Sequence, residues 1–483
     1  MYEIFIGIDI GTQGVRVICL DASGQVKSNS EIAFDNSPHQ KPQQWHQQNP
    51  LDWWKYVALC LKKSLAEINP EEILAISVSS TSGTVCFLDK TYYPLMPAIM
   101  YNDRRSEKQA ITLNGVLKNL TEKLGYRFNS SYALAKILWV KENMPQIFEK
   151  TLRIVHAADF ITGKLTGNFC VSDYTNVLKT GYDLIDGKWP DEIEKILGIS
   201  KEILPEPVAS GAVIGVVSVN CSNETGLPPG VPVAAGMTDG CASQVSTGAV
   251  FPGEWNSTLG TTLVIKGVTE KILKDPLGRI YSHRHPDGWW LPGGASNTGG
   301  ECIIKKFDKA KWESLNNKAE KIVPGKHICW PLAVKGERFP FVNPDARGFE
   351  PEDCDEETLY AAYLEGVGYI EKLAYQTLQE LGAEVKEIIR IAGGGTKSNI
   401  WNRIRASILE KTLALPANTN AAAGAAILAA SRTYFKNLNQ ACENMVKIIR
   451  YYEPEKTLIN AYQDLYQKFL QELKKRNYIK KGF

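Results

Sequence analysis

A short motif that occurs twice constrains the fold of this chain more than any other feature. Residues 4–21, "IFIGIDIGTQGVRVICLD", have the pattern of a strand, a glycine turn with a hydroxyl residue, and a second strand. The same pattern returns in residues 256–268, "NSTLGTTLVIKGV". A repeated supersecondary unit predicts two related domains, with a boundary near residues 246–256. A chain of 483 residues is also too long for one ordinary core.

Composition argues against several classes of partner. The net charge is +2 and the lysines and arginines are spread along the chain, so we expect neither a nucleic-acid nor a membrane partner. The ten cysteines lack CxxC spacing, which argues against a zinc site and a disulfide framework. No secretory signal is visible, and no apolar run has the length of a membrane span. A cytoplasmic location is expected, or an organellar one if a transit peptide has been removed.

The remaining sequence alternates strand patterns with amphipathic helix patterns, which predicts an α/β protein. We expect a helix from about Pro50, a strand in "EEILAISVSS" (71–80), and a buried strand in "GVPVAAGMT" (230–238). In the second half we expect a long helix over 357–381 with Gly382 as its C-cap, and an alanine-rich helix over 418–432. The last 50 residues are expected to be helical and packed on the surface.

The first glycine turn, "GIDIGTQGVR", has the residues of a phosphate site. Backbone N–H groups around Gly11 can form a nest for an anionic oxygen, and Thr12 adds a hydroxyl donor. Asp9 beside such a nest indicates a bridging cation, usually Mg²⁺. A plain hairpin with a capping aspartate explains the same residues, because short glycine patterns are common. Both interpretations remain open at this point.

Asp239 directly follows the buried strand, where binding and catalytic groups commonly lie. Its carboxylate can accept a proton from an attacking hydroxyl, as in other phosphoryl-transfer sites. The alternative is an N-cap for the following helix.

Two further glycine turns follow along the chain. "TLGTT" (258–262) offers hydroxyls for a second phosphate, and "AGGGTKSNIW" (392–401) lets a flat nucleotide base approach the backbone. A tight turn between strand and helix is the alternative for the triple glycine. The order of the four features across two domains is stronger evidence than any one of them.

This ordered set resembles the FGGY carbohydrate kinases of the actin-like ATPase superfamily, from about residue 5 to residue 430. It most resembles the cyanobacterial and plant D-ribulose kinases, also known as xylulose-kinase-like proteins. The stretches that carry this resemblance include "TSGTVCFLD" (81–89), "MYND" (100–103), "SSYALAKILW" (130–139), "SDYTNVLKTGYD" (172–183), "WLPGGASNTGG" (290–300) and "GERFP" (336–340).

The resemblance implies two actin-like (ribonuclease H-like) ATPase domains, each a mixed sheet flanked by helices, with the active-site cleft between them. It implies an N-terminal, mainly sugar-binding domain over 1–248 and a C-terminal, mainly ATP-binding domain over 249–435. We expect a C-terminal helical extension over 436–483. The implied cofactors are ATP and Mg²⁺, and the implied state is a monomer or homodimer.

The resemblance also implies roles for single residues. Asp9 would orient Mg²⁺ and the sugar, and Asp239 would be the general base. The γ-phosphate would be held by Gly11 and Thr12. In the second domain, phosphates would contact Gly260, Thr261 and Thr262, and adenine would lie against Gly394 and Gly395, with Asn399 nearby.

The substrate is indicated by departures from the xylulose kinases. Those enzymes usually carry Gln-Met-His, whose Met and His touch xylulose, where this chain has Thr81-Ser82-Gly83. Ser82 matches a sugar-contacting serine of the D-ribulose kinases. We expect phosphorylation of D-ribulose to D-ribulose 5-phosphate. The alternatives are a D-xylulose kinase, a kinase for another ketose or polyol, and two non-enzymes, an actin-like ATPase and a sugar-binding regulator. For Lys179, shaping the cleft and a structural role both remain open.

Overall fold

The computed structural model describes residues 2–35 and 45–479, and it divides into two compact units. Unit 1 comprises Met1–Val250, His283–Trp290 and Asn418–Lys447. Unit 2 comprises Phe251–Ser282, Leu291–Ala417 and Ile448–Phe483. Among the described residues, no helix combines the length and the apolar character needed to cross a membrane. The assignment of sugar binding to residues 1–248 and of ATP binding to 249–435 stays a prediction.

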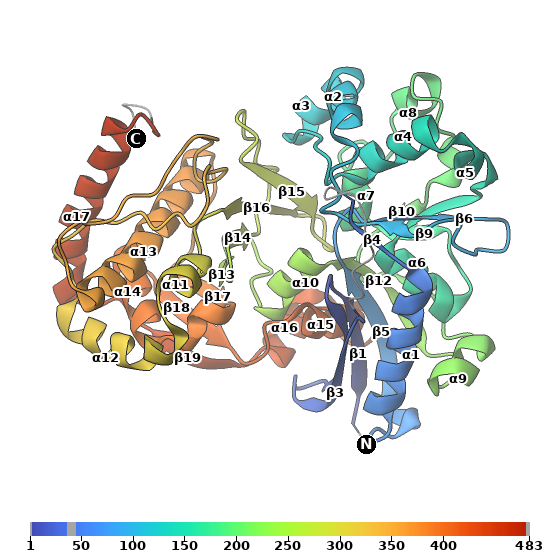
Figure 1. Cartoon of the computed structure of the whole chain (residues 1–483). Coiled ribbons are helices and arrows are strands. Elements are labelled where there is room, and N and C mark those ends of the chain that lie inside the picture. Colours follow the sequence, from blue (N-terminus) through green and yellow to red (C-terminus); the bar gives the residue numbers. More distant parts are fainter. Residues whose placement is uncertain (1, 36–44, 480–483) are drawn as a thin grey trace. The chain divides into compact units, whose positions relative to one another are not determined.

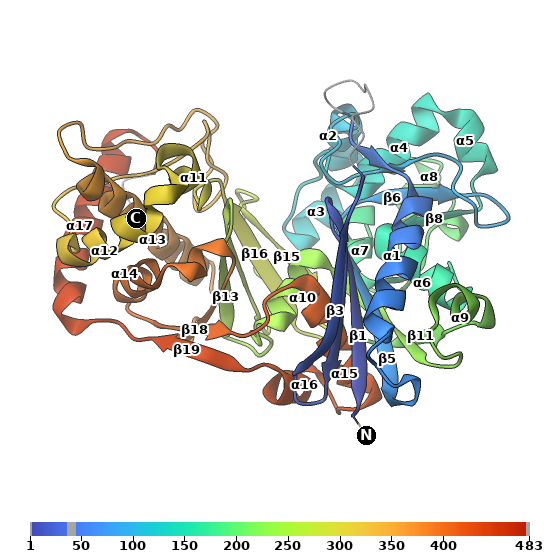
Figure 2. The same ribbon diagram turned by 60° about the horizontal axis from the view of Figure 1, so that its bottom comes forward.

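Unit 1 is built on a six-stranded sheet with the order β11-β12-β5-β1-β2-β3 (Figures 1 and 2). In that order the strands are Val213–Val216, Pro232–Thr238, Ile73–Ser80, Ile4–Ile10, Gly14–Asp21 and Val26–Ala33. Strands β1, β5 and β12 run parallel, and β2, β3 and β11 are antiparallel to their neighbours. Two smaller sheets complete the unit: β4 (Gln47–Gln48), β7 (Ala98–Ile99), β6 (Val85–Leu88) and β8 (Arg153–His156), and β10 (Glu206–Val208) with β9 (Val171–Asp173).

Unit 2 repeats this topology in its seven-stranded sheet, β15-β16-β14-β13-β17-β18-β19. In that order the strands are Ile280–Arg284, Trp290–Ser296, Leu263–Gly267, Trp255–Leu259, Ile388–Ala392, Thr412–Pro416 and Ile448–Tyr452. Strand β13 pairs antiparallel with β14 and parallel with β17, as β1 does with β2 and β5. The strands β18 and β19 correspond to β12 and β11. The sequence repeat is thus confirmed as a repeat of strand order.

Alternation along β1 explains how its sheet is covered. Ile4, Ile6 and Ile8 belong to the same buried cluster as Trp53 and Val57 of helix α1 (Pro50–Leu65). Figure 1 shows α1 running beside this sheet. On the opposite face, Gly7 lets helix α15 (Ala421–Thr433) approach so closely that a Cβ at Gly7 would lie 1.8 Å from the Ala422 carbonyl oxygen. Asp9 shares the Gly7 face, because it lies two residues further along the strand.

The remaining helices surround these sheets. In unit 1 they are α2 (Glu107–Val116), α3 (Lys118–Leu124), α4 (Ala133–Asn143), α5 (Pro145–Lys150), α6 (Ala157–Thr166), α7 (Tyr174–Val177), α8 (Asp191–Lys195), α9 (Val219–Thr225), α10 (Asp239–Ser246) and α16 (Leu438–Met445). In unit 2 they are α11 (Glu301–Lys306), α12 (Trp312–Ile322), α13 (Glu356–Glu380), α14 (Asn399–Leu409) and α17 (Lys456–Lys475). Gly382, predicted as a C-cap, follows α13 with φ of 96°.

The C-terminal segment differs from the expected helical, surface-packed extension. It contains the strand β19, which pairs antiparallel with β18 (Figure 2). Helix α17 buries Tyr462, Tyr466 and Phe469 in the core of unit 2. The buried residues of α17 form one continuous apolar stripe along the helix, and its lysines lie outside this stripe. Such a stripe is stable only when it packs against other apolar residues. The high lysine content of this segment led to the prediction of a surface helix, although one face of the helix is buried.

Candidate functional site

One edge of the unit 1 sheet gathers the predicted catalytic residues. Strands β1, β5 and β12 are parallel neighbours, so their carboxyl ends meet at the same edge. Asp9 lies in β1 opposite Ser79 of β5, and Thr238 at the end of β12 lies opposite Ser80. Asp239 is the next residue. Two carboxylates 230 positions apart in the chain are therefore brought to one edge, with β5 between their strands.

Asp9 is the centre of a polar row across this sheet. The Ser79 hydroxyl donates to its Oδ1 at 2.8 Å, and Arg16 lies opposite Asp9 on β2. Arg16 in turn pairs with Glu31 of β3 at 2.7 Å. Burial and then the charge of Asp239 raise the pKa of Asp9 to about 7, and the Ser79 hydroxyl and Arg16 oppose this rise. The Asp239 charge acts on Asp9 because the two carboxylates are close.

The first glycine turn forms the hairpin between β1 and β2. Gly11 N–H donates to the Gly14 carbonyl at 3.0 Å. The Gln48 side chain donates to the Thr12 carbonyl at 2.7 Å, and the Trp53 indole holds Gln48 at 2.8 Å. The structure thus shows the hairpin that both interpretations require, and the phosphate role of this turn stays a prediction. Gln48 supports the turn through its hydrogen bond to Thr12. The sequence did not indicate this role, because the two residues are 36 positions apart.

Asp239 is not the N-cap of the following helix. The N-cap is Thr238, which makes no side-chain capping bond, and Asp239 is the first helical residue of α10. Its Oδ1 accepts the Gly240 N–H at 2.6 Å. The positive end of a helix favours a negative charge, so this place supports an ionised carboxylate.

Ser82 lies in the loop that leaves β5 at the same edge. Its Oγ is shielded from solvent and has no hydrogen-bond partner in the described part of the chain. A buried hydroxyl without a partner is uncommon in proteins and calls for a specific explanation.

In unit 2, three glycine turns pack against one another. The Gly260–Thr262 turn joins β13 to β14, and Gly300 N–H donates to the Gly260 carbonyl at 2.7 Å. Gly393 has φ of 88°, and a Cβ there would lie 2.5 Å from the Leu259 carbonyl oxygen. A Cβ at Gly395 would lie 2.5 Å from the Leu259 side chain. Close packing thus explains two of the three consecutive glycines.

Three of the predicted nucleotide-binding glycines are not needed by the fold. Among the described residues, a Cβ at Gly11 would meet only an ordinary contact at 3.6 Å, and a Cβ at Gly260 would have its nearest neighbour at 3.9 Å. A Cβ at Gly394 would meet no described atom within 4 Å. None of the three has a backbone conformation in the left-handed region. Neither packing nor backbone geometry requires glycine at these three positions, and a glycine without a side chain leaves room for a ligand.

Two residues of unit 2 have contacts that the sequence did not predict, and the position of Asn399 near an adenine pocket stays a prediction. Asn399, predicted near the adenine pocket, accepts from Arg450 at 2.9 Å and from the Tyr452 hydroxyl at 2.8 Å, so its side-chain oxygen is engaged with β19. Glu337, which was not singled out, is buried and accepts from Ser296 Oγ at 2.8 Å, Asn297 N–H at 2.7 Å and Thr298 Oγ1 at 3.0 Å. It fixes the 297–300 turn against Gly260. The only signal was its place in "GERFP".

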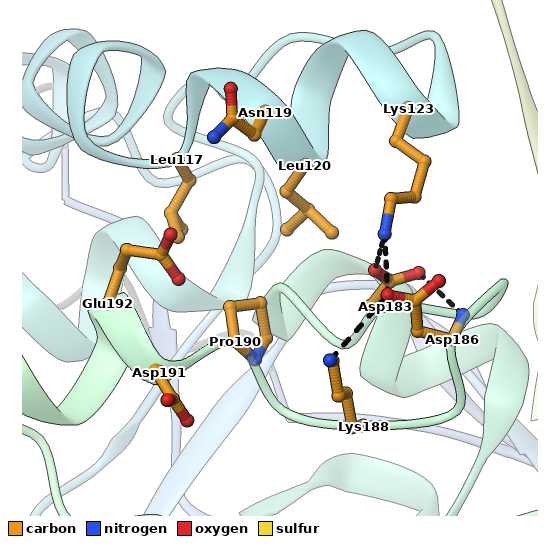
Figure 3. A pocket seen from close by; sticks show the side chains of 10 residues that line it. All are labelled: Leu117, Asn119, Leu120, Lys123, Asp183, Asp186, Lys188, Pro190, Asp191 and Glu192. Carbon is orange, nitrogen blue, oxygen red and sulfur yellow. Dashed lines mark hydrogen bonds and ion pairs between the residues drawn. The ribbon is translucent and has the colours of Figure 1, made fainter.

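A hollow of about 320 Å³ elsewhere in unit 1 is a poor candidate site (Figure 3). The Lys123 ammonium in its lining donates to Asp183 at 2.6 Å and to Asp186 at 2.8 Å, so these three charged groups are already paired. Its described lining includes none of the predicted site residues.

Comparison with known proteins places the chain in a family. Residues 4–246 match the N-terminal domain of the FGGY family of carbohydrate kinases, and residues 256–433 match its C-terminal domain. The chain is 26% identical to the xylulose kinase of Bacillus subtilis (strain 168), over 99% of each chain. It is also 26% identical to the gluconokinase of that organism, over 86% of this chain and 85% of the relative.

A solved structure of a xylulose kinase from Brucella ovis has a TM-score of 0.89 at 25% identity, covering 98% of this chain and 99% of that one. The predicted α/β class with two actin-like domains is confirmed by this match and by the repeated strand order. The chain therefore belongs to the FGGY family of carbohydrate kinases, and it is an ATP-dependent sugar kinase.

Proposed function

We propose that this kinase transfers the γ-phosphate of ATP to the terminal hydroxyl of D-ribulose, giving D-ribulose 5-phosphate. The observation that carries the proposal is the grouping of Asp9, Asp239 and the Ser82 loop at one edge of the unit 1 sheet. A carboxylate pair beside a buried, unpartnered hydroxyl suits a ligand that is itself rich in hydroxyls.

In the proposed reaction Asp239 is the general base. It takes the proton from the sugar hydroxyl as that oxygen bonds to the γ-phosphorus, and the bond from phosphorus to the β,γ-bridging oxygen breaks to release ADP. The Gly240 N–H fixes the Asp239 carboxylate by its Oδ1 contact, which limits its rotation. The N–H groups of the turns at Gly11 and Gly260 are proposed to bind phosphate oxygens and to stabilise their charge.

Mg²⁺ fits the carboxylate of Asp9. Mg²⁺ is usually held by one or two carboxylates, with phosphate oxygens and waters completing its shell. The Asp9 carboxylate offers oxygen atoms as ligands, and the charge of Asp239 repels it. A bound cation would relieve this repulsion. Among the described residues, no group of three or more His, Cys, Asp or Glu is arranged to hold a metal ion by itself. When bound with ATP, Mg²⁺ would neutralise phosphate charge, and Asp9 would hold it while also orienting the sugar.

D-Xylulose is the second candidate, because several relatives are xylulose kinases. Thr81, Ser82 and Gly83, where xylulose kinases usually carry Gln-Met-His, favour D-ribulose. Release of ADP is to be measured with D-ribulose, D-xylulose, L-ribulose, ribitol and gluconate at equal concentrations. We expect the highest kcat/KM with D-ribulose. A higher value with any other sugar of this panel would overturn the proposed substrate.

A further inference from the structure

The loop Thr81–Gly83 is held firmly beside the carboxylate pair. Thr81 N–H donates to the Ile10 carbonyl at 3.3 Å, and its hydroxyl is hydrogen-bonded to the Thr84 hydroxyl at 2.8 Å. Because β5 lies between β1 and β12, the loop leaves the sheet between the strands that carry Asp9 and Thr238. Residues 82 and 83 therefore lie at the same edge of the sheet as Asp9 and Thr238.

No side chain fits at position 83. Gly83 has φ of 86°, and a Cβ there would lie 2.2 Å from the backbone carbonyl oxygen of Ser131. The same Cβ would lie 3.1 Å from Cδ of Lys179. A backbone oxygen cannot move aside as a flexible side chain can. The space that a sugar-contacting histidine would need in this chain is thus filled by Ser131 and Lys179.

Lys179 places a positive charge at this loop. Its side chain is buried, with Nζ 3.5 Å from the Ser82 carbonyl oxygen and 5.7 Å from the centre of the Tyr132 ring. The neighbouring Lys136 is fully buried and donates to the Ser130 carbonyl at 2.7 Å. Burial, and after it the charge of Lys179, hold the pKa of Lys136 well below its usual range.

Ser82 supplies a second polar group at the same place. Its carbonyl faces Lys179, and its Oγ is buried without a partner among the described residues. An ammonium with three donors and a hydroxyl that both donates and accepts are complementary to neighbouring hydroxyls of a sugar.

We propose that Lys179 is a specificity-determining residue that donates a hydrogen bond to a hydroxyl of the bound sugar, beside the contact made by Ser82. In this proposal, Lys179 makes the sugar contact that a side chain at position 83 would otherwise make, although it belongs to a different segment of the chain. The inference rests on the proposed binding of a ketopentose at the Thr81–Gly83 loop.

The test is steady-state kinetics of Lys179→Met, which keeps the apolar stem and removes the ammonium. Loss of a hydrogen bond from a charged donor is expected to raise KM for D-ribulose about 10- to 100-fold. KM for ATP and the Tm are expected to stay near the unsubstituted values, and the preference for D-ribulose over D-xylulose is expected to fall. Lys136→Met is the matched control, because it also removes a buried lysine amine bonded to a backbone carbonyl. We expect it to leave KM for D-ribulose within about twofold.

An unchanged KM for D-ribulose in Lys179→Met would overturn the inference. A parallel loss of ATP affinity and Tm, or an equal KM effect in Lys136→Met, would also overturn it by indicating a structural role. If Lys179→Met does not fold, Lys179→Arg decides, since the larger guanidinium cannot occupy the same position and should shift KM several-fold. If the unsubstituted enzyme prefers another sugar, the proposed substrate fails, and the same variants are then measured with that sugar.

Discussion

Replacing Asp239 with asparagine keeps the shape of the side chain and removes the proposed proton acceptor. We expect kcat to fall by about 10²- to 10⁴-fold, the usual contribution of a general base. The affinity for ATP, measured by calorimetric titration, is expected to change little, because none of the proposed nucleotide contacts is made by Asp239. Asp186→Asn, a change in the ion-paired hollow of unit 1, is the control and should keep the unsubstituted kcat. Near-normal turnover of Asp239→Asn would contradict the role of base.

Gly260→Ala separates a ligand-binding role from a structural one. The new methyl group would have no neighbour nearer than 3.9 Å, so the Tm is expected to stay or to rise, in line with a gain of about 0.4–1 kcal/mol for compatible Gly→Ala changes. KM for ATP is expected to rise at least about fivefold, because the methyl group would meet the phosphate. Gly115→Ala in helix α2, also in open space, is the matched control. An unchanged KM for ATP would remove Gly260 from the proposed phosphate site.

At the scale of elements, the 297–300 turn depends on the carboxylate of Glu337. Both carboxylate oxygens accept hydrogen bonds, so Glu337→Gln must turn an amide N–H₂ toward at least one donor. We expect a loss of about 1–3 kcal/mol of stability and a higher KM for ATP, with KM for the sugar nearly unchanged. Asp345→Asn in the same segment, whose side chain is exposed, serves as the control. Equal changes in both KM values would show that Glu337 supports the fold in general and not the turn.

The structure shows which glycines of the predicted turns are required by packing and which are not. The turn at Gly11 left a hairpin and a phosphate nest as alternatives, and the structure shows a hairpin whose Gly11 is not required by packing. The triple glycine was more than a tight turn needs. Packing against Leu259 accounts for Gly393 and Gly395, but not for Gly394, whose predicted role in adenine binding stays a prediction.

At the scale of the whole molecule, a buried acid joins three distant segments of unit 2. Glu365 of α13 is fully buried, accepts the Gly325 N–H at 2.8 Å, and lies beside Tyr462 of α17. Burial raises the pKa of Glu365 to about 7, against the effects of the Gly325 N–H and the Tyr462 hydroxyl. The folded protein therefore binds a proton at this group more tightly than the unfolded chain does.

This difference makes stability depend on pH. Between about pH 4.5 and pH 7 the unfolded chain loses the Glu365 proton and the folded protein keeps it, so stability falls as pH rises. The side chain of Glu365→Gln does not titrate, so the variant does not lose this stability as pH rises. Its amide oxygen can still accept the Gly325 N–H. We expect it to be more stable than the unsubstituted protein at pH 8, by on the order of 2 kcal/mol, and no more stable at pH 4.5. Thermal unfolding of both proteins from pH 4.5 to 8 is the measurement, and parallel Tm curves would contradict this account.

The sequence alone determined the repeat, the α/β alternation, the resemblance to the FGGY kinases and the positions of Asp9 and Asp239. Each of these depends on a local pattern: a glycine turn between strands, apolar periodicity, or an acid that follows a strand. Local patterns persist in the sequence because neighbouring residues must satisfy the backbone geometry of the same element.

Only the tertiary structure decided which distant residues meet. The hydrogen bond from Ser79 to Asp9, the filling of the space at Gly83 by Ser131 and Lys179, and the bracing of a turn by Glu337 all join segments far apart in the chain. Such contacts depend on strand register and helix packing, which leave no periodic signal in the sequence. The burial of α17 could not be predicted from the sequence for the same reason, because the residues that it packs against come from earlier elements of unit 2.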